Sequence, residues 1–485
     1  MERLIGRKKE QEVLNKIVSS PDAEFLAIYG RRRVGKTFLV REFFKHEDFY
    51  FEAIGEKDGS MHEQLLNFHD SIQKAFSPGI PLKQPDTWKE AFSILTTLIE
   101  KLKIRKKIIL FFDELPWMAT KRSGFIQALD HYWNKTWSRI SNLKLIVCGS
   151  AASWVLDNLI HAKGGLYNRL TGAIHLVPFS LKETKEYLLS RKINLKNDQI
   201  LDIYMVFGGI PFYLHYIDKG KSPAQIINSL CFSRDAPFFT EFNQLFKSLF
   251  EHSEVHVRLI REIARKRFGI SREELLKALG MSSGGTFKKR LDELEASSFI
   301  EIFTPYGRSK KDFYIKIIDE YTLFYLHFID AVKQSRTIGK NKNYWLSVSK
   351  EPAFKIWSGY AFEAVCLKHI DKIIRALGLE NLAKQIGSWR FVPQKGSLQS
   401  GAQIDLLIDR LDNAITLCEI KYAGSMYTID KQYANNLKNK ITVFENQTKT
   451  RKQLFLAAIT THGIKRNVWS EDLITSEVTL SDLFL

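Results

Sequence analysis

The chain has 485 residues, 45% of them hydrophobic and 26% charged, a balance that excludes wholesale disorder. Its length predicts about three domains rather than one. No uncharged apolar run approaches the roughly 18 residues of a membrane span, and the charged opening lacks the apolar core of a signal peptide. The 72 Lys and Arg against 54 Asp and Glu give a net charge of +18, which favours polyanionic partners. We therefore expect a cytoplasmic protein with no membrane partner, whose charge permits binding to nucleic acid, DNA above all, without demanding it.

The first half of the chain alternates apolar strand-like runs with helical stretches, as α/β domains with a parallel sheet do. A helix at 36–44 follows the first strand. After Ser180 the pattern becomes helical, with a break at GGIP (208–211), and a phenylalanine-rich helical stretch follows at 231–250. The expected strands are residues 25–29, 48–53, 107–114, 143–150 and 173–179.

The segment GRRRVGKT lies between the first strand and the first helix, where a phosphate-binding loop belongs. Its glycines let backbone N–H groups surround phosphates at a helix N-terminus. This pattern predicts that ATP and Mg²⁺ bind here, with Lys36 at the β and γ phosphates and Thr37 on the metal. The side chains of Arg31, Arg32 and Arg33 are expected to face solvent or a partner. The residues expected to contact nucleotide are Gly30, Arg31, Arg32, Arg33, Val34, Gly35, Lys36, Thr37 and Phe38.

Two acids, Asp113 and Glu114, end the apolar run 108–112. The carboxyl end of a parallel strand is where such sheets bind their ligand. We expect Asp113 to hold the magnesium through water and Glu114 to act as general base for the attacking water. A pair of solvated loop acids is the alternative, and the buried strand before them argues against it.

Two further residues are assigned to the same site. Ser150, at the end of the fourth strand, is placed to sense the γ-phosphate, although capping of the following helix explains it equally well. Arg169 is expected to complete the site as an arginine finger, supplied by a moving segment or by a neighbouring subunit of a homo-oligomer.

Residues 255–318 predict a winged helix, in which a helix and a helix–turn–helix precede a strand pair. The candidate recognition helix carries Lys288, Lys289 and Arg290, but as many acids follow them. A helix that reads DNA normally carries an excess of basic side chains. The balance favours an intramolecular regulatory module over direct DNA reading. The aromatic helix 318–332 is expected to pack in a core.

Near the C-terminus, Asp405 lies on one predicted strand and Glu419 and Lys421 on the next, with Glu363 on the preceding helix. Residues two apart share a face of a strand, so Glu419 and Lys421 point the same way. The three acids could bind a divalent metal, while Lys421 could steady a hydroxide or a phosphate oxygen. This pattern resembles PD-(D/E)xK nucleases and the domain of unknown function that closes many archaeal-type ATPase chains. A solvated surface pair is the alternative.

The motifs of the first two thirds resemble, in order, those of archaeal-type ATPases of the STAND branch of AAA+ proteins. The resemblance implies that Ile5, Gly6 and Arg7 lie against the adenine and that Pro211 touches the nucleotide from the lid. One departure is that no second sensor arginine is evident in the lid. The segments that carry the resemblance are LIGRKKE, IYGRRRVGKTFLV, ILFFDELPWM, VCGSAAS, LYNRLTG, VPFS and GGIPFYL.

The expected fold is therefore α/β: a P-loop NTPase parallel sheet (1–179) with a helical lid (180–254), a winged helix (255–333) and a restriction-endonuclease-like α/β domain (344–485). The resemblances imply an ATP-hydrolysing switch that controls a nuclease-like domain acting on nucleic acid, with a role in genome defence or mobile-element control. One alternative is a regulatory ATPase whose C-terminal domain is an inactive nuclease fold used for binding. Another is a DNA-binding regulator.

Overall fold

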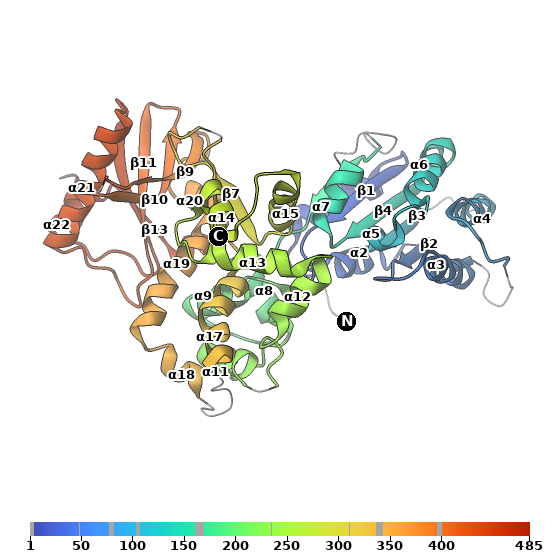
Figure 1. Ribbon diagram of the computed structural model, residues 1–485, viewed down its shortest axis with the longest axis horizontal. Coiled ribbons are helices and arrows are strands. Elements are labelled where there is room, and N and C mark those ends of the chain that lie inside the picture. Colours follow the sequence, from blue (N-terminus) through green and yellow to red (C-terminus); the bar gives the residue numbers. More distant parts are fainter. Residues whose placement is uncertain are drawn as a thin grey trace. The chain divides into compact units, whose positions relative to one another are not determined.

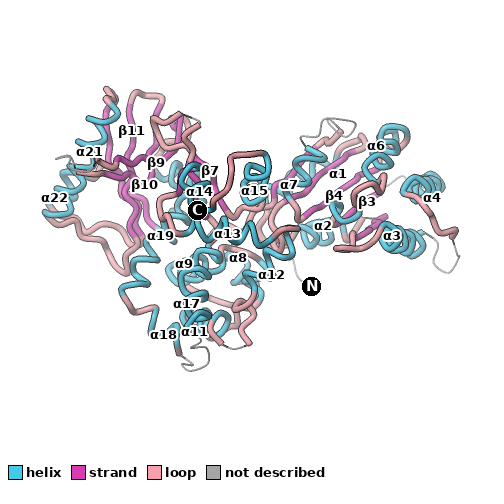
Figure 2. The backbone as a smooth tube through the Cα atoms, in the orientation of Figure 1, coloured by secondary structure: helices cyan, strands magenta, loops and turns pink. Residues whose placement is uncertain are grey.

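The computed structural model describes residues 4–485 except 48, 77–81, 103–106, 161–168, 234, 310, 336–342 and 395–399. The chain divides into two compact units (Figure 1). The first comprises residues up to 178 together with 249–251 and 288–298, and the second comprises 179–248, 252–287 and 299–485. Within the described ranges, no helix is both long and apolar enough to cross a membrane. Figure 2 shows the helices and strands of both units.

The first unit is built on a five-stranded parallel sheet, as the sequence predicts (Figure 1). The strand order is β2-β3-β4-β1-β5, so β1, which leads into the phosphate loop, lies between β4 and β5. Every residue of β3 and β4 is buried, because helices must cover both faces of a parallel sheet. Asp48, the expected first residue of β2, lies outside the described residues. The strands are β1 (Glu24–Tyr29), β2 (Phe49–Ile54), β3 (Ile108–Asp113), β4 (Leu143–Gly149) and β5 (Gly172–His175).

An aromatic core joins the helices of this unit to the sheet. Phe92 of α4 stacks on Phe112 of β3 with ring centroids 5.9 Å apart, and Trp137 donates an indole hydrogen bond to Thr96. The start of α4 is set by Thr87, whose side chain accepts from the Glu90 backbone N–H. The helices are α1 (Lys8–Ser19), α2 (Lys36–Phe44), α3 (Met61–Phe76), α4 (Trp88–Lys101), α5 (Leu115–Met118), α6 (Phe125–Lys135) and α7 (Ala152–Val155).

The second unit opens with the helices of the expected lid: α8 (Leu181–Ser190), α9 (Asn197–Phe207), α10 (Pro211–His215), α11 (Pro223–Cys231) and α12 (Glu241–Leu249). Ser180 and Glu183 form a capping box that begins α8. The helical stretch expected at 231–250 is helical only in its second half, because α11 ends at Cys231 and α12 begins at Glu241. Pro237 explains the break, since proline has no N–H to donate and disfavours helical backbone at the residue before it.

The middle segment forms α13 (Ser253–Ala264), α14 (Arg272–Leu279), α15 (Gly285–Ala296) and an antiparallel sheet in the order β6-β8-β7. The strands are β6 (Ile270–Ser271), β7 (Ile300–Phe303) and β8 (Tyr314–Ile317). Ser271 caps α14, and Gly280 ends it with a φ of 62°. These are the elements of the expected winged helix, whose identity stays a prediction. The basic residues at 288–290 belong to the first unit.

The aromatic segment 318–332 packs in a core, as expected. It is not one regular helix, because α16 (Glu320–Phe324) passes through a π-turn at Tyr325–Ile329 into α17 (Asp330–Ser335). Tyr325 stacks on Phe242 with centroids 4.3 Å apart, and Phe328 meets Trp345 edge to face. Such buried ring contacts leave no face for base stacking.

The C-terminal part of the second unit contains a five-stranded mixed sheet in the order β13-β12-β11-β10-β9. Strands β9, β10 and β11 are antiparallel, whereas β11, β12 and β13 are parallel. The sequence did not predict β9 or β13, since β9 is half polar and β13 is short. The strands are β9 (Ala383–Phe391), β10 (Ala402–Arg410), β11 (Ala414–Lys421), β12 (Gln453–Thr460) and β13 (Ser476–Thr479).

Helices cover both faces of this sheet. Leu437 and Phe444 of α21 join the core cluster that contains Ile415 and Leu417 of β11. Phe362 of α19 contacts the ring of Tyr422, which follows β11. The helix expected at 353–377 is interrupted at His369. The helices are α18 (Tyr344–Val348), α19 (Pro352–Lys368), α20 (Ile370–Ala376), α21 (Lys431–Thr448) and α22 (Val468–Leu473).

Candidate functional site

The phosphate loop joins β1 to α2 and depends on its two glycines. Gly30 has a φ of 142°, and a Cβ there would lie 2.3 Å from the carbonyl oxygen of Leu176; Gly35 has a φ of 94°. Lys36 is buried, and its Nζ donates to the carbonyls of Gly30 at 2.9 Å and Arg31 at 3.1 Å. Burial lowers the pKa of Lys36, while Glu114 and Asp113 oppose the shift. The ammonium group therefore lies inside the loop, where it can meet a phosphate.

Thr37 and Asp113 meet beside the loop. The Thr37 hydroxyl donates to Asp113 Oδ2 at 2.6 Å, and the Glu114 N–H donates to Asp113 Oδ1 at 3.0 Å. Burial raises the pKa of Asp113, which the hydrogen bond from Thr37 partly offsets. A hydroxyl and a carboxylate side by side are oxygen ligands of the kind that Mg²⁺ prefers, so these two residues fit the expected metal.

Glu114 contacts Ser150, a pair that the sequence did not predict. Glu114 Oε2 accepts from the Ser150 N–H at 3.0 Å and from its hydroxyl at 2.8 Å. The neighbouring order β3-β4 brings the ends of these strands together. The capping role considered for Ser150 is wrong, since α7 has Ala151 at its N-cap. A phosphate-sensing role stays a prediction.

The N-terminal segment 5–7 reaches the phosphate loop through Arg7. This arginine is 3% exposed and donates to the carbonyl oxygens of Val34 (3.0 Å) and Val177. Gly6 and Arg7 both have positive φ, of 64° and 57°. Ile5 and Gly6 are half-buried beside it. The segment therefore borders the loop, and its assignment to adenine stays a prediction.

The three arginines of the loop do not behave alike. Arg31 is 2% exposed, so the expectation that its side chain faces solvent is wrong. Arg32 and Arg33 are half-buried, and Arg33 has a φ of 74°.

The remaining expected nucleotide residues are more scattered. Val34 is buried, whereas Phe38 is 39% exposed. Arg169 is exposed and directly follows 161–168, so most of the LYNR motif lies outside the described residues. Pro211 begins α10 after two glycines of positive φ, and it belongs to the second unit.

In the C-terminal part, Glu419 is held by three donors. Its carboxylate accepts from the hydroxyl of Tyr433 and from Lys440 Nζ at 2.6 Å, and it pairs with Lys421 Nζ at 3.1 Å. Burial opposes ionisation of Glu419, but the two lysines outweigh it and hold its pKa below the usual value. Lys440 was missed from the sequence, although it lies seven residues, or two helical turns, after Tyr433 on α21.

Asp405 and Glu363 form the second part of this cluster. Asp405 lies where the pairing of β10 with β9 shifts register, and it accepts from Gln403 at 2.8 Å. Glu363 pairs with Arg267 at 3.7 Å. Burial raises the pKa of Asp405, with Glu419 adding to it, and burial with the nearby Asp405 raises the pKa of Glu363 to about 8.

The expected metal site of Glu363, Asp405 and Glu419 is not assembled here. Across the described ranges, no three His, Cys, Asp or Glu side chains lie where they could share a metal ion. The three acids lie close enough to shift one another's pKa, yet Glu419 is engaged by lysines and Glu363 by Arg267. Metal binding by Asp405 and Glu419 therefore stays a proposal.

Comparison with known proteins concerns the first of the two candidate sites, the one around the phosphate loop. Residues 4–217 match the model of an ATPase domain found predominantly in Archaea. This segment is similar to archaeal-type ATPase domains. It contains the phosphate loop, Asp113, Glu114 and Ser150, and it extends into the first lid helices up to α10.

The similarity to known proteins extends beyond residues 4–217. An uncharacterised protein of Methanocaldococcus jannaschii is 25% identical over 438 residues, which span 86% of this chain and 87% of that one. An uncharacterised ATP-binding protein of the same organism is 40% identical over 43 residues, 9% of this chain and 73% of its own. A Walker-type ATPase of Pyrococcus abyssi has a solved structure with a TM-score of 0.49 and 21% identity, covering 67% of this chain and 96% of that one.

Proposed function

We propose that this protein is an ATP-hydrolysing switch whose nucleotide state controls a nuclease-like C-terminal domain acting on nucleic acid. The observation that carries the proposal is the convergence of Lys36, Thr37 and Asp113 at the end of β3 within an archaeal-type ATPase domain. The name of the second relative, an ATP-binding protein, supports the same assignment.

The side chains of the ATPase domain divide the chemistry among them. Lys36 exchanges its bonds to the loop carbonyls for phosphate oxygens. Thr37 and Asp113 would hold Mg²⁺, which would neutralise charge on the phosphates when bound. Glu114 orients the attacking water, and Ser150 leaves it Oε1 for that purpose by bonding only Oε2. Arg169 is the candidate finger.

The nucleotide half is tested with Glu114→Gln. The amide keeps the size and hydrogen bonding of the side chain but cannot accept a proton. We expect ATP binding, measured by calorimetry, to be unchanged and the hydrolysis rate to fall by about 10²–10⁴-fold. A wild-type protein that takes up no adenine nucleotide would remove the proposal altogether.

The nuclease half rests on the mixed sheet and its acids. Asp405 lies at a register shift in β10, a kind of irregularity enriched next to active sites. Glu419 and Lys421 lie on one face of β11, 3.1 Å apart, where the carboxylate would hold a metal and the ammonium group a phosphate oxygen. Cleavage of DNA with Mg²⁺ or Mn²⁺ that Asp405→Ala abolishes would support this half; cleavage that survives the substitution would exclude it.

A second candidate function is a switch whose C-terminal domain binds nucleic acid without cutting it. The specific observation in its favour is Glu419, which two lysines and Tyr433 already occupy. Absence of cleavage together with a nucleotide-dependent change in oligomeric size would favour it. The third option, DNA reading by residues 288–290, is weakened by the pairing of Arg290 with Glu293 at 2.9 Å.

A further inference from the structure

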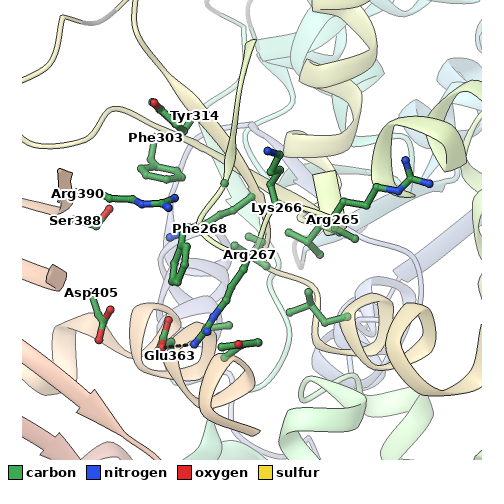
Figure 3. A pocket seen from close by; sticks show the side chains of 18 of the residues that line it. Arg265, Lys266, Arg267, Phe268, Phe303, Tyr314, Glu363, Ser388, Arg390 and Asp405 are labelled. Carbon is green, nitrogen blue, oxygen red and sulfur yellow. Dashed lines mark ion pairs between the residues drawn. The ribbon is translucent and has the colours of Figure 1, made fainter. Parts of the chain in front are cut away.

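A pocket of about 1000 Å³ lies within the second unit, between the middle segment and the C-terminal sheet (Figure 3). One wall comes from the end of α13 and the residues 265–269 that follow it, with β7 and β8. The other comes from α19, β9 and β10. This volume is at the upper end for small-ligand sites, so it has room for more than one small molecule.

The pocket is strongly basic. Eight Arg and Lys and four Asp and Glu are among the described residues that line it. Several of the cations have acidic partners, such as Arg265 with Glu262 at 2.9 Å and Lys316 with Glu301 at 2.9 Å. Arg308 and Arg390 are exposed and have no acidic partner among the residues that the structure describes. These two guanidinium groups are available to an anion.

Aromatic rings are interleaved with these cations. Phe268 lies between Arg267 and Arg390 in Figure 3, with its ring centroid 4.8 Å and 5.0 Å from the two guanidinium carbons. Lys316 lies over Phe303 at 4.7 Å. Single-stranded nucleic acids bind to surfaces of this kind. Their unstacked bases lie against aromatic rings or guanidinium planes, and their phosphates contact the cations.

The acids of the nuclease-like cluster line the same pocket. Glu363 and Asp405 lie on the side of the pocket that carries Arg390 and Ser388, below them in Figure 3. Arg267 crosses from the opposite wall to pair with Glu363. A phosphodiester chain held by the basic residues would therefore share the pocket with Asp405.

We propose that this pocket binds an unpaired stretch of nucleic acid, with phosphates on Arg308 and Arg390 and bases against the rings and guanidinium planes beside Phe268. The inference rests on the nucleic-acid role proposed above, and it adds that the middle segment supplies half of the binding site. Walls on both sides favour a single strand, because only unpaired bases can stack on protein side chains.

The test measures binding by the full chain, without ATP and in EDTA, so that neither hydrolysis nor cleavage contributes. Fluorescence anisotropy would follow labelled oligodeoxythymidine and oligouridine of about 16 nucleotides, and a blunt duplex of equal length. The variant is Arg308→Glu with Arg390→Glu. Its control is Arg375→Glu with Arg466→Glu, which changes the net charge equally at exposed positions outside the pocket.

We expect the single strands to bind more tightly than the duplex. We expect the affinity of the pocket variant to fall at least about tenfold. The slope of log affinity against log salt concentration should become shallower by roughly one to two. The affinity of the control should stay within about twofold of the wild-type value. Comparing oligodeoxythymidine with oligouridine shows whether the pocket prefers a strand with deoxyribose or with ribose. Equal losses in both variants, an unchanged pocket variant, or a duplex bound as tightly as a single strand would each overturn the inference. Melting curves verify folding. If strands bind but are never cut, only the nuclease half of the proposed function fails.

Discussion

At the scale of single residues, the ATPase site depends on a carboxylate held in an unusual backbone conformation. Glu114 has a φ of 49°, a left-handed conformation that costs a non-glycine residue about 1–2 kcal/mol. Two hydrogen bonds from Ser150 offset part of this cost and hold the side chain in one orientation. Strain at such a place is typical of functional residues.

Ser150 is therefore expected to act as a positioning residue. Ser150→Ala removes the hydroxyl bond and leaves the backbone one, so we expect kcat for ATP hydrolysis to fall about tenfold with little change in ATP affinity. Ser150→Thr keeps the hydroxyl and should restore most of the rate. Steady-state kinetics with calorimetry separate these effects. A loss of ATP affinity in the alanine variant would instead point to direct contact with the phosphates.

A second prediction at this scale concerns pH. Burial raises the pKa of Asp202 on α9 to about 6, although Tyr422 donates to its carboxylate at 2.9 Å. The folded protein then binds this proton more tightly than the unfolded chain, so its contribution to stability falls as pH rises from about 4 to about 6 and stays low above that.

Asp202→Asn can accept the same hydrogen bond without carrying a charge. We expect it to raise the free energy of unfolding by about 2 kcal/mol at pH 8 and to change little at pH 4. Denaturant titrations at both pH values measure the difference. Equal effects at the two pH values would show that the carboxylate is not strained by burial.

At the scale of elements, the phosphate loop requires glycine at Gly30 for two separate reasons. A Cβ would lie 2.3 Å from the Leu176 carbonyl oxygen, and the φ of 142° disfavours any side chain. Gly124 has a φ of 73° with nothing within 4 Å of a Cβ, so it shares the strain without the clash.

The two glycines therefore form a matched pair. Gly30→Ala should abolish nucleotide binding and destabilise the protein by about 2–3 kcal/mol, whereas Gly124→Ala should cost about 1 kcal/mol and leave binding intact. Thermal melting with and without ATP compares them. Retention of ATP binding by Gly30→Ala would mean that the loop can shift away from Leu176.

At the scale of the whole molecule, the lid helices contact the C-terminal part directly. Tyr422, next to Lys421, donates to Asp202 of α9, and Leu181 of α8 donates its N–H to the ring of His369 at 3.0 Å. Lys368 of α19 pairs with the buried Glu320 at 2.6 Å. The sequence predicted that the winged helix passes on the nucleotide state, and these contacts offer two routes to the C-terminal part: a direct one from α8 and α9 of the lid, and one through Glu320 of the middle segment.

Replacing the buried ion pair between Lys368 and Glu320 tests the route through the middle segment. Lys368→Met with Glu320→Gln removes the charges without leaving one unpaired. We expect ATP binding to be unchanged and the effect of ATP on nucleic-acid binding, a coupling expected to be about 5–150-fold, to be lost. Lys355→Met, at an exposed position on the same helix α19, is the control. Coupling that survives the double substitution would favour the direct route from the lid.

Local patterns are enough to predict which residues form the expected nucleotide site, because its parts are encoded over short distances. GRRRVGKT between a strand and a helix, and the acids after an apolar run, place Lys36, Thr37, Asp113 and Glu114 without knowledge of the rest. The same holds for Glu419 and Lys421 on one strand face. The residues that bond to these side chains were harder to predict. Ser150 lies close to Glu114 only because β3 and β4 are neighbours in the sheet.

By itself, the sequence determined the parallel sheet of the first unit, the loop at the end of β1 and the acids at the end of β3, because strand periodicity and loop composition are local. Tertiary structure decided the burial of Arg31, the capture of Glu419 by Lys440, and the pocket shared by residues 265–269 and β9. The physical reason is that burial and ion pairing depend on which distant segments meet in the fold. In addition, edge strands such as β9 have too weak an apolar pattern to be recognised from the sequence.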